Sequence, residues 1–323
     1  MQRRLILLVP SPGAVTMAQL AAGTQAGTTY RARRHWARYR AGYLFLAPSA
    51  ILYALFMIYP FFQSIYLSFN DWNGVGAIGD YVGLRNYRAL IHDDLLWRSL
   101  GHNAIWVVIG TIGPLVLGLL LAMLLWRQPK GFTLFRTVYF LPQVLSPVII
   151  AIVWGWVYNP VFGLLNQGLD AVGLEGLSRG WLGDSSTALY AVLAAAIWAE
   201  TGFVFVVFLA GLQTVSKDLL EAATLDGANA WQRLKDVTIP QLANVITVIT
   251  ALLLIGGFSV FDIIFVMTQG GPNHSTEVIA TYTYTEAFTQ NHAGYSATLS
   301  LVLTVISLIA SVVFIRFRER GAE

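Results

Sequence analysis

Six apolar stretches, each long enough to cross a lipid bilayer, dominate the sequence. A transmembrane helix needs about 20 apolar residues. The stretches lie near residues 42–69, 104–126, 137–158, 188–212, 243–268 and 295–315. Only 11% of the residues are charged, against about 25% in soluble domains, and no segment between the stretches could form a separate soluble domain. The sequence therefore predicts an all-α integral membrane protein with six transmembrane helices.

The distribution of lysine and arginine predicts the orientation of these helices, because basic residues concentrate in cytoplasmic loops. If both termini are cytoplasmic, 16 of the 20 basic residues lie on the inner side. The outer side then keeps only Arg85, Arg88, Arg98 and Arg179. We therefore expect both termini, and the loop at 214–242, in the cytoplasm.

The first 40 residues are expected to form a cytoplasmic tail that ends in a basic juxtamembrane segment, RARRHWARYR at 31–40. Residues 1–10 begin like a signal peptide, but the five arginines of the juxtamembrane segment oppose export. Two interpretations stay open: a disordered tail, or upstream sequence before a true start at Met17. The six-span domain is then expected over 41–318, followed by a short C-terminal tail at 319–323.

Local patterns add detail at the outer surface and inside the spans. In the first outer loop, 70–102, apolar residues recur at helical spacing and are interrupted by Asp93 and Asp94, which predicts one or two short surface helices. Three prolines interrupt the second and third spans: Pro114, Pro142 and Pro147. Each removes a backbone donor and favours a kink, which serves either a cavity or ordinary bundle packing.

The loop at 214–242 contains the most polar stretch between two spans, EAATLDGANAWQRLKDVTIPQL. Ser216 is a good N-cap for the helix-forming residues that follow it. Gly227 fits the left-handed position that ends a helix, Asn229 can cap a second helix, and Pro240 marks the start of the next span. The sequence therefore predicts two short helices around a glycine turn.

The composition of this loop suits contact with another protein. The small side chains of Ala222 and Ala223 allow a partner to approach closely, and Glu221 and Asp226 offer negative charge. The spacing from Glu221-Ala222-Ala223 to Gly227 and Pro240 resembles the EAA loop of ABC-importer permeases. In that family the loop docks into a cleft of the ATP-hydrolysing subunit. The family pattern ends in isoleucine, any residue, leucine and proline, whereas this chain has Val237, Thr238, Ile239 and Pro240.

Three further stretches resemble carbohydrate permeases that work with a binding protein: GLRNYRAL, FRTVYFLPQVLSPVIIAIVWGWVYNPVFGLLN and FDIIFVMTQGGPNHSTEVIATYTYTEAF. The resemblance runs from about residue 40 to the carboxy terminus and is closest to the maltose and glycerol-phosphate types. It implies the type I ABC-importer permease fold, in the plasma membrane of a prokaryote. The implied partners are a second homologous permease, two cytoplasmic ATP-binding subunits, an extracytoplasmic solute-binding protein, a sugar and membrane lipid.

The sequence offers no chemistry of its own. It has no cysteine and no Gly-Lys dipeptide, so a Walker phosphate-binding loop is excluded. Its five histidines show no metal-ligand spacing, and no nucleophilic set can be recognised. We therefore expect a transport subunit that is not an enzyme, without cofactor, metal or nucleic acid. ATP and Mg²⁺ would bind to the partner ATPase.

Two carboxylates, Glu200 and Asp262, interrupt the fourth and fifth spans. A central carboxylate costs roughly 2.5 to 3.5 kcal/mol on insertion scales, so such groups are usually functional. We expect Glu200 to face a polar pathway, while for Asp262 a structural bridge near the outer gate is slightly favoured. By alignment with the maltose-type family on the coupling loop and GGP, further pathway candidates are Trp198, Phe203, Gly256, Gly257 and Ser259.

The sequence thus predicts one half of an ATP-driven sugar channel. A glycerol-3-phosphate importer permease is the nearest alternative. An ion-coupled secondary transporter is a rival from another class, and a membrane scaffold is weaker still. The sequence names neither the sugar nor the permease subunit that binds it.

Overall fold

The computed structural model describes residues 42–320, and the predicted tail at 1–40 lies outside them, as do residues 321–323. The described residues form helices, turns and loops, with one isolated antiparallel bridge between Asn70 and Tyr81. The chain divides into two compact units between Gln63 and Ser64. An apolar helix, Gly42–Leu67, runs through this division and includes the π-helical turn η1 (Ala54–Ile58) and α2 (Tyr59–Leu67).

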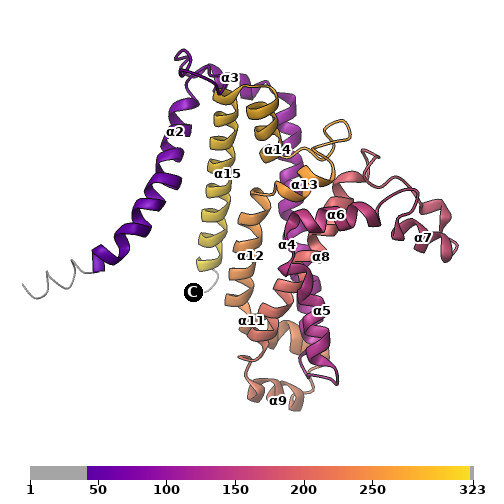
Figure 1. Cartoon of the computed structure of the whole chain (residues 1–323). Coiled ribbons are helices and arrows are strands. Elements are labelled where there is room, and N and C mark those ends of the chain that lie inside the picture. Colours follow the sequence, from indigo (N-terminus) through magenta and orange to yellow (C-terminus); the bar gives the residue numbers. More distant parts are fainter. Residues whose placement is uncertain (1–41, 321–323) are drawn as a thin grey trace, which may run out of the picture. The chain divides into compact units, whose positions relative to one another are not determined.

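The second unit contains the remaining elements (Figure 1). In chain order they are α3 (Arg85–Ile91), α4 (Asp94–Leu125), α5 (Phe132–Val144), α6 (Pro147–Val157), α7 (Leu164–Ala171), η2 (Glu175–Leu177), α8 (Ala188–Leu212), α9 (Lys217–Leu225), α10 (Ala230–Gln232), η3 (Arg233–Thr238), α11 (Ile239–Gln241), α12 (Ala243–Phe258), α13 (Asp262–Met267), α14 (Ile279–Tyr284), η4 (Thr285–Thr289) and α15 (Ala293–Arg320).

Several of these helices are long and apolar enough to cross a membrane. Within the described residues four qualify alone: Gly42–Leu67, Asp94–Leu125, Ala188–Leu212 and Ala293–Arg318. The number rises to six if each of two bent helix pairs counts as one span. The protein is therefore a multi-pass membrane protein. Five of the six predicted apolar stretches match these helices or bent pairs to within three residues at their C-terminal ends, whereas the stretch at 243–268 continues beyond the end of the second pair at Phe258 and includes α13.

The third predicted span, 137–158, is broken rather than kinked. Helices α5 and α6 meet at 104°. Leu145 leaves the helical conformation, and the Ser146 hydroxyl caps α6 by accepting a hydrogen bond from Val148 N at 3.3 Å. Pro147 takes the first helical position, where a missing N–H is harmless. By contrast, α4 continues through Pro114.

The fifth predicted span, 243–268, is also interrupted. Helix α12 ends at Phe258 and α13 begins at Asp262, so three residues between them are not helical. The segment at 70–102, predicted to contain one or two short helices, contains the short helix α3 and the first turns of α4. Asp93 caps α4 by accepting bonds from Leu95 N and Leu96 N.

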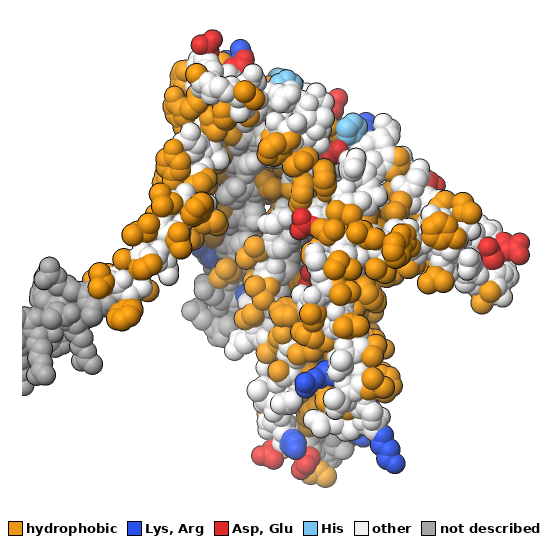
Figure 2. Space-filling model, viewed as in Figure 1, with side chains coloured by type: hydrophobic (Ala, Val, Ile, Leu, Met, Phe, Trp, Pro, Cys, Tyr) orange, Lys and Arg blue, Asp and Glu red, His pale blue; other side chains and the backbone are white. Residues whose placement is uncertain are grey.

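Helix α8 lies at the centre of the second unit. It packs along α4 and α5, and α12 lies against α4 and α15. The approach to α5 is so close that a Cβ at Gly202 would collide with the carbonyl oxygen of Tyr139. On the face shown in Figure 2, apolar side chains cover the flanks of the helices, while blue and red side chains gather near the end that carries α9.

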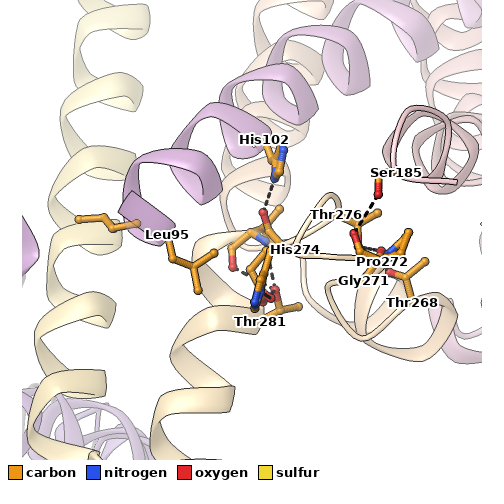
Figure 3. A network of polar contacts seen from close by, with 12 residues as sticks. Leu95, His102, Ser185, Thr268, Gly271, Pro272, His274, Thr276 and Thr281 are labelled. Carbon is orange, nitrogen blue, oxygen red and sulfur yellow. Dashed lines mark hydrogen bonds and ion pairs between the residues drawn. The ribbon is translucent and has the colours of Figure 1, made fainter. Parts of the chain in front are cut away.

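At the end of the helix bundle opposite α9, polar contacts hold the loop at 269–294, which contains α14 and η4. His102 Nδ1 on α4 lies 2.7 Å from the carbonyl oxygen of Glu277, and Asn103 Oδ1 accepts a bond from Ile279 N at 2.9 Å. The Thr276 hydroxyl donates to the carbonyl oxygen of Gly271 at 2.8 Å (Figure 3). The contacts of His102 and Asn103 fix the loop to the N-terminal part of α4, and the Thr276 bond closes a turn within the loop.

Candidate functional site

The polar loop at 214–242 adopts the predicted helix–turn–helix form. The Ser216 hydroxyl accepts a bond from Leu219 N at 3.4 Å and caps α9. Gly227 ends the helix at φ +81°, a conformation that residues with a side chain rarely adopt. Asn229 and Gln232 then form a reciprocal capping box, with bonds of 2.8 and 2.9 Å. Local hydrogen bonds therefore define both helices.

The two ends of the loop are tied together. The backbone N–H of Ser216 donates to Gln241 Oε1 at 2.9 Å, across 25 residues. Inside the loop, the Arg233 guanidinium donates to the carbonyl oxygen of Ala228 at 2.6 Å. The segment that includes α10 and α11 meets α12 at 72°. Pro240 lies at the start of α11, just before this bend. The loop therefore forms a braced projection at the end of α8 and α12.

Helix α9 has two different sides. Lys217, Glu221 and Thr224 follow one another at helical spacing and line a hollow beside the end of α4. Leu219, Ala222 and Asp226 point away from that hollow and are exposed, while Ala223 is half-buried. Leu225, at the end of the helix, is 89% exposed. The exposed side thus combines small and apolar side chains with one carboxylate.

A cavity of about 430 Å³ lies between α8 and the interrupted fifth span. Six of the seven predicted pathway residues line it: Glu200, Phe203, Gly256, Gly257, Ser259 and Asp262. Sequence reasoning had not identified three further lining residues, Trp106, Gln143 and Phe261. The structure therefore brings parts of α4, α5, α8, α12 and α13 together around one space.

Trp198 does not belong to this cavity. It lines a separate apolar groove between α4, α5 and α8, and its ring stands edge-on to Trp154 with centroids 5.6 Å apart. Two residues along an α-helix differ by about 200° in direction, so Trp198 and Glu200 point to opposite sides of α8. The structure therefore separates Trp198 from the other six pathway candidates.

The two carboxylates in the cavity have no partner within the described residues. Glu200 is half-buried and Asp262 is exposed, and no described side chain or backbone N–H donates a hydrogen bond to either carboxylate. Asp262 begins α13, directly after the break in the fifth span. The bridging role for Asp262 therefore finds no contact in the described chain, and both groups are available to a bound solute.

Aromatic rings extend from the cavity toward α14 and η4, in the loop at 269–294. Phe261, which lines the cavity, stacks on Phe265 with centroids 5.0 Å apart. Phe265 contacts Tyr284 at 4.7 Å, and Tyr284 contacts Phe288 at 4.9 Å. Phe261 and Phe265 are four residues apart in the sequence, as are Tyr284 and Phe288, so each pair stands at helical spacing. Only the fold brings Phe265 beside Tyr284 and joins the two pairs in one row.

The described residues contain no group of three or more histidine, cysteine or acidic side chains that could hold a metal ion. The cavity lining itself offers groups for hydrogen bonding and ring stacking: carboxylates, an amide, a hydroxyl and aromatic faces, with no lysine or arginine among its residues.

Comparison with known proteins gives consistent matches. Residues 114–320 match a family described as "Binding-protein-dependent transport system inner membrane component". The probable ABC transporter permease YurN of Bacillus subtilis strain 168 is 37% identical over 283 residues, covering 87% of this chain and 97% of YurN. The multiple sugar-binding transport system permease MsmF of Streptococcus mutans is 33% identical over 279 residues, covering 86% of this chain and 95% of MsmF.

A solved structure shares the fold. It is the crystal structure of a bacterial ABC transporter involved in the import of the acidic polysaccharide alginate. One of its chains superposes with a TM-score of 0.78 at 22% identity, covering 91% of this chain and 100% of that chain. At this identity the likeness establishes the fold.

Proposed function

The chain belongs to the family of binding-protein-dependent transport system inner membrane components, and on that premise we propose that it forms half of the channel of an ATP-driven carbohydrate importer. The single observation that carries the sugar pathway is the cavity with two unpartnered carboxylates and a row of aromatic rings leading away from it. The hydroxyl groups of a sugar can donate hydrogen bonds to the two carboxylates, and sugar rings stack on aromatic faces.

The proposed domain has six spans over 41–318, with both termini and the loop at 214–242 in the cytoplasm of a prokaryotic cell. Helices α5 and α6 would together form the third span, and α12 with α13 would form the fifth. The 16-to-4 distribution of basic residues supports this orientation. The proposal also places the flanking tails, 1–40 and 319–323, inside the cell.

The proposed coupling surface is the braced loop, with Glu221, Ala222, Ala223, Asp226, Gly227 and Pro240. Its exposed side offers Leu219, Ala222 and Asp226 to a separate ATPase chain, and its two ends are joined by the Ser216–Gln241 bond. A loop tied at both ends transmits a pull to α8 and α12 together. ATP and Mg²⁺ would act on the ATPase subunits, and a second permease would close the other side of the channel.

Two alternatives predict different energetics or substrates. A glycerol-3-phosphate importer would need cations for the phosphate, and the cavity lining of this chain contains two carboxylates and no lysine or arginine. An ion-coupled secondary transporter would need no docking loop for an ATPase. The observations therefore favour an ATP-driven importer of carbohydrates.

The deciding experiment is uptake into proteoliposomes that contain the chain with its partner permease and ATPase subunits. The binding protein, first matched to its sugar by thermal-shift screening against a carbohydrate panel, is added outside, and ATP is enclosed. We expect uptake that requires both ATP and the binding protein and that vanadate abolishes. Uptake that persists without ATP and collapses with an ionophore would instead identify a secondary transporter.

A further inference from the structure

A basic hollow lies beside α9. Helix α9 belongs to the loop at 214–242 and lies at one end of the helix bundle (Figure 1). The hollow has a volume of about 550 Å³, and its charged lining residues are Arg127, Lys217, Arg233 and Glu221. The three cations come from three segments: the turn after α4, the first position of α9, and η3. With one opposing carboxylate, the hollow carries a formal charge of about +2.

The cations of this hollow are not paired within the described chain. Neither Arg127 nor Lys217 makes an ion pair or a side-chain hydrogen bond with any described residue. Arg233 donates to the carbonyl oxygen of Ala228 and has no carboxylate partner among the described residues. Glu221 lines the same space but lies beyond ion-pair distance of all three. The hollow is therefore electrostatically suited to an anion.

Apolar side chains line part of the basic hollow as well. Trp126, from the end of α4, and Leu220, on α9, both border it. A smaller recess of about 260 Å³ shares Trp126 and Lys217 with the hollow, and its lining mixes apolar side chains with Gln128 and Gln213. A molecule with an anionic head and a hydrocarbon chain therefore suits the hollow, because cations and apolar side chains lie next to each other there.

The location of the two compartments matches the headgroup level of a bilayer. Trp126 directly follows the long apolar helix α4, and α8 ends at Leu212, close to the recess. Tryptophan and basic residues concentrate at this level of membrane proteins. Basic pockets between helices on the cytoplasmic side bind anionic headgroups.

We propose that this site binds an anionic phospholipid, with the headgroup phosphate among Arg127, Lys217 and Arg233 and the beginning of one acyl chain beside Trp126 and Leu220. The inference rests on the proposed function only for the assignment of the site to the cytoplasmic leaflet. A lipid bound here touches α9 and the end of α4 at once. It would therefore brace the loop from the side opposite Leu219, Ala222 and Asp226.

Lipid retention tests the site without relying on transport. The full chain, in complex with its partner subunits, is reconstituted in nanodiscs of phosphatidylglycerol and phosphatidylcholine, extracted into detergent, and analysed for bound lipid by native mass spectrometry. The test variant carries Arg127→Gln, Lys217→Gln and Arg233→Gln. The matched control carries Lys130→Gln, Arg136→Gln and Lys235→Gln, which remove the same charge at the same end but outside the hollow.

We expect the wild-type complex and the control to retain phosphatidylglycerol in preference to phosphatidylcholine. The test variant should lose that preference, by roughly fivefold for each basic side chain removed. If the triple variant fails to assemble, Arg127→Gln can be tested alone, because Arg127 lies in the exposed turn after α4. This single variant should lose roughly fivefold of the preference for phosphatidylglycerol.

Three results would overturn the proposal. Equal lipid retention by the test and control variants would exclude the site. Complete displacement of the lipid by inorganic phosphate would identify a site for soluble anions instead. Unchanged lipid binding together with weaker ATPase association in the test variant would assign the hollow to an acidic group of that partner. None of these outcomes depends on sugar uptake. The uptake experiment can therefore fail without affecting the test of lipid binding, and the reverse also holds.

Discussion

Trp198 and Glu200 are two residues apart on α8 but line different cavities. Glu200 faces the space shared with α12 and α13, whereas Trp198 lies in the apolar groove formed with α4 and α5. Helix α8 therefore has a side that faces the proposed pathway and a side that packs against other helices. Substitutions on the two sides should affect different measurements.

Gly256→Leu should block the proposed pathway. Gly256 lines the cavity, and a Cβ at this position would meet no atom within 4 Å, so the leucine can extend into the space. We expect uptake to fall roughly tenfold or more, as a loss of about 1.4 kcal/mol in substrate binding would produce. Uptake is measured per assembled complex.

Gly155→Leu is the matched control for this substitution. Gly155 is also free of atoms within 4 Å of a Cβ, but it lies on α6 outside the cavity. Normal uptake by Gly256→Leu, at normal assembly, would move the substrate site to the partner permease.

Glu200→Leu and Trp198→Ala should have opposite profiles. Removing the Glu200 carboxylate should reduce uptake while leaving the amount of complex unchanged. Glu200→Gln should be milder, because the amide keeps an acceptor. Trp198→Ala removes a ring contact with Trp154, of the kind worth about 0.5 to 1.5 kcal/mol, and should lower the amount of complex instead. Reduced uptake per complex in Trp198→Ala would contradict the separation of the two sides.

Gly227→Val should uncouple the ATPase from transport. The φ of +81° is costly for a β-branched residue, by about 1–2 kcal/mol. We expect normal membrane insertion but loss of transport and of substrate-stimulated ATPase activity. Gly227→Asn is the control, since asparagine tolerates this conformation better. Equal transport by both variants and the wild type would remove the proposed role of the turn.

The orientation can be tested with single cysteines, because the native chain contains none. A cysteine at Ser216 should react with a membrane-impermeant reagent only from the cytoplasmic side. A cysteine at Asn273 should react only from outside. Labelling of both positions from the same side would be incompatible with six spans.

Asp93 should make stability depend on pH. Burial alone would raise the pKa of Asp93, but hydrogen bonds from Tyr282 and Tyr295, and from the amides of Leu96 and Leu95, outweigh it and leave the pKa below its usual value. A lowered folded-state pKa gives stabilisation that is complete above about pH 4 and is lost as the pH falls through the folded value. We therefore expect this contribution to disappear in strong acid.

The comparison uses Asp93→Asn, which keeps an N-cap but does not titrate. Unfolding of this variant and the wild type is followed from pH 7 downward, with Asp94→Asn as the control. The two curves should differ at pH 7 and converge below about pH 4. A difference that stays constant over the whole range would show that Asp93 acts through its shape alone.

Local sequence determined the parts of the molecule that could be predicted well. Ser216, Gly227 and Asn229 define the loop helices through bonds to residues at most five positions away, so their residue types were sufficient. The apolar stretches were recognised because membrane helices depend on composition and length. Asp93 likewise separates α3 from α4 by a local cap.

The remaining features depend on contacts between distant segments. Helix α8 is apolar on all sides, so its sequence contains no periodic pattern that shows which side faces the cavity. This is why Trp198 was grouped with Glu200. The break at Leu145 and Ser146 could be suspected from Pro147, but its 104° angle depends on the packing of α6 against α13.

A Cβ at Gly202 would collide with the carbonyl oxygen of Tyr139, so α5 and α8 pack backbone against backbone at this point. We expect two helices packed this closely to move together when the cavity opens. The non-helical joints after Val144 and after Phe258 are then the expected hinges. A crosslink across either joint should slow transport while leaving the association of the partner subunits unchanged.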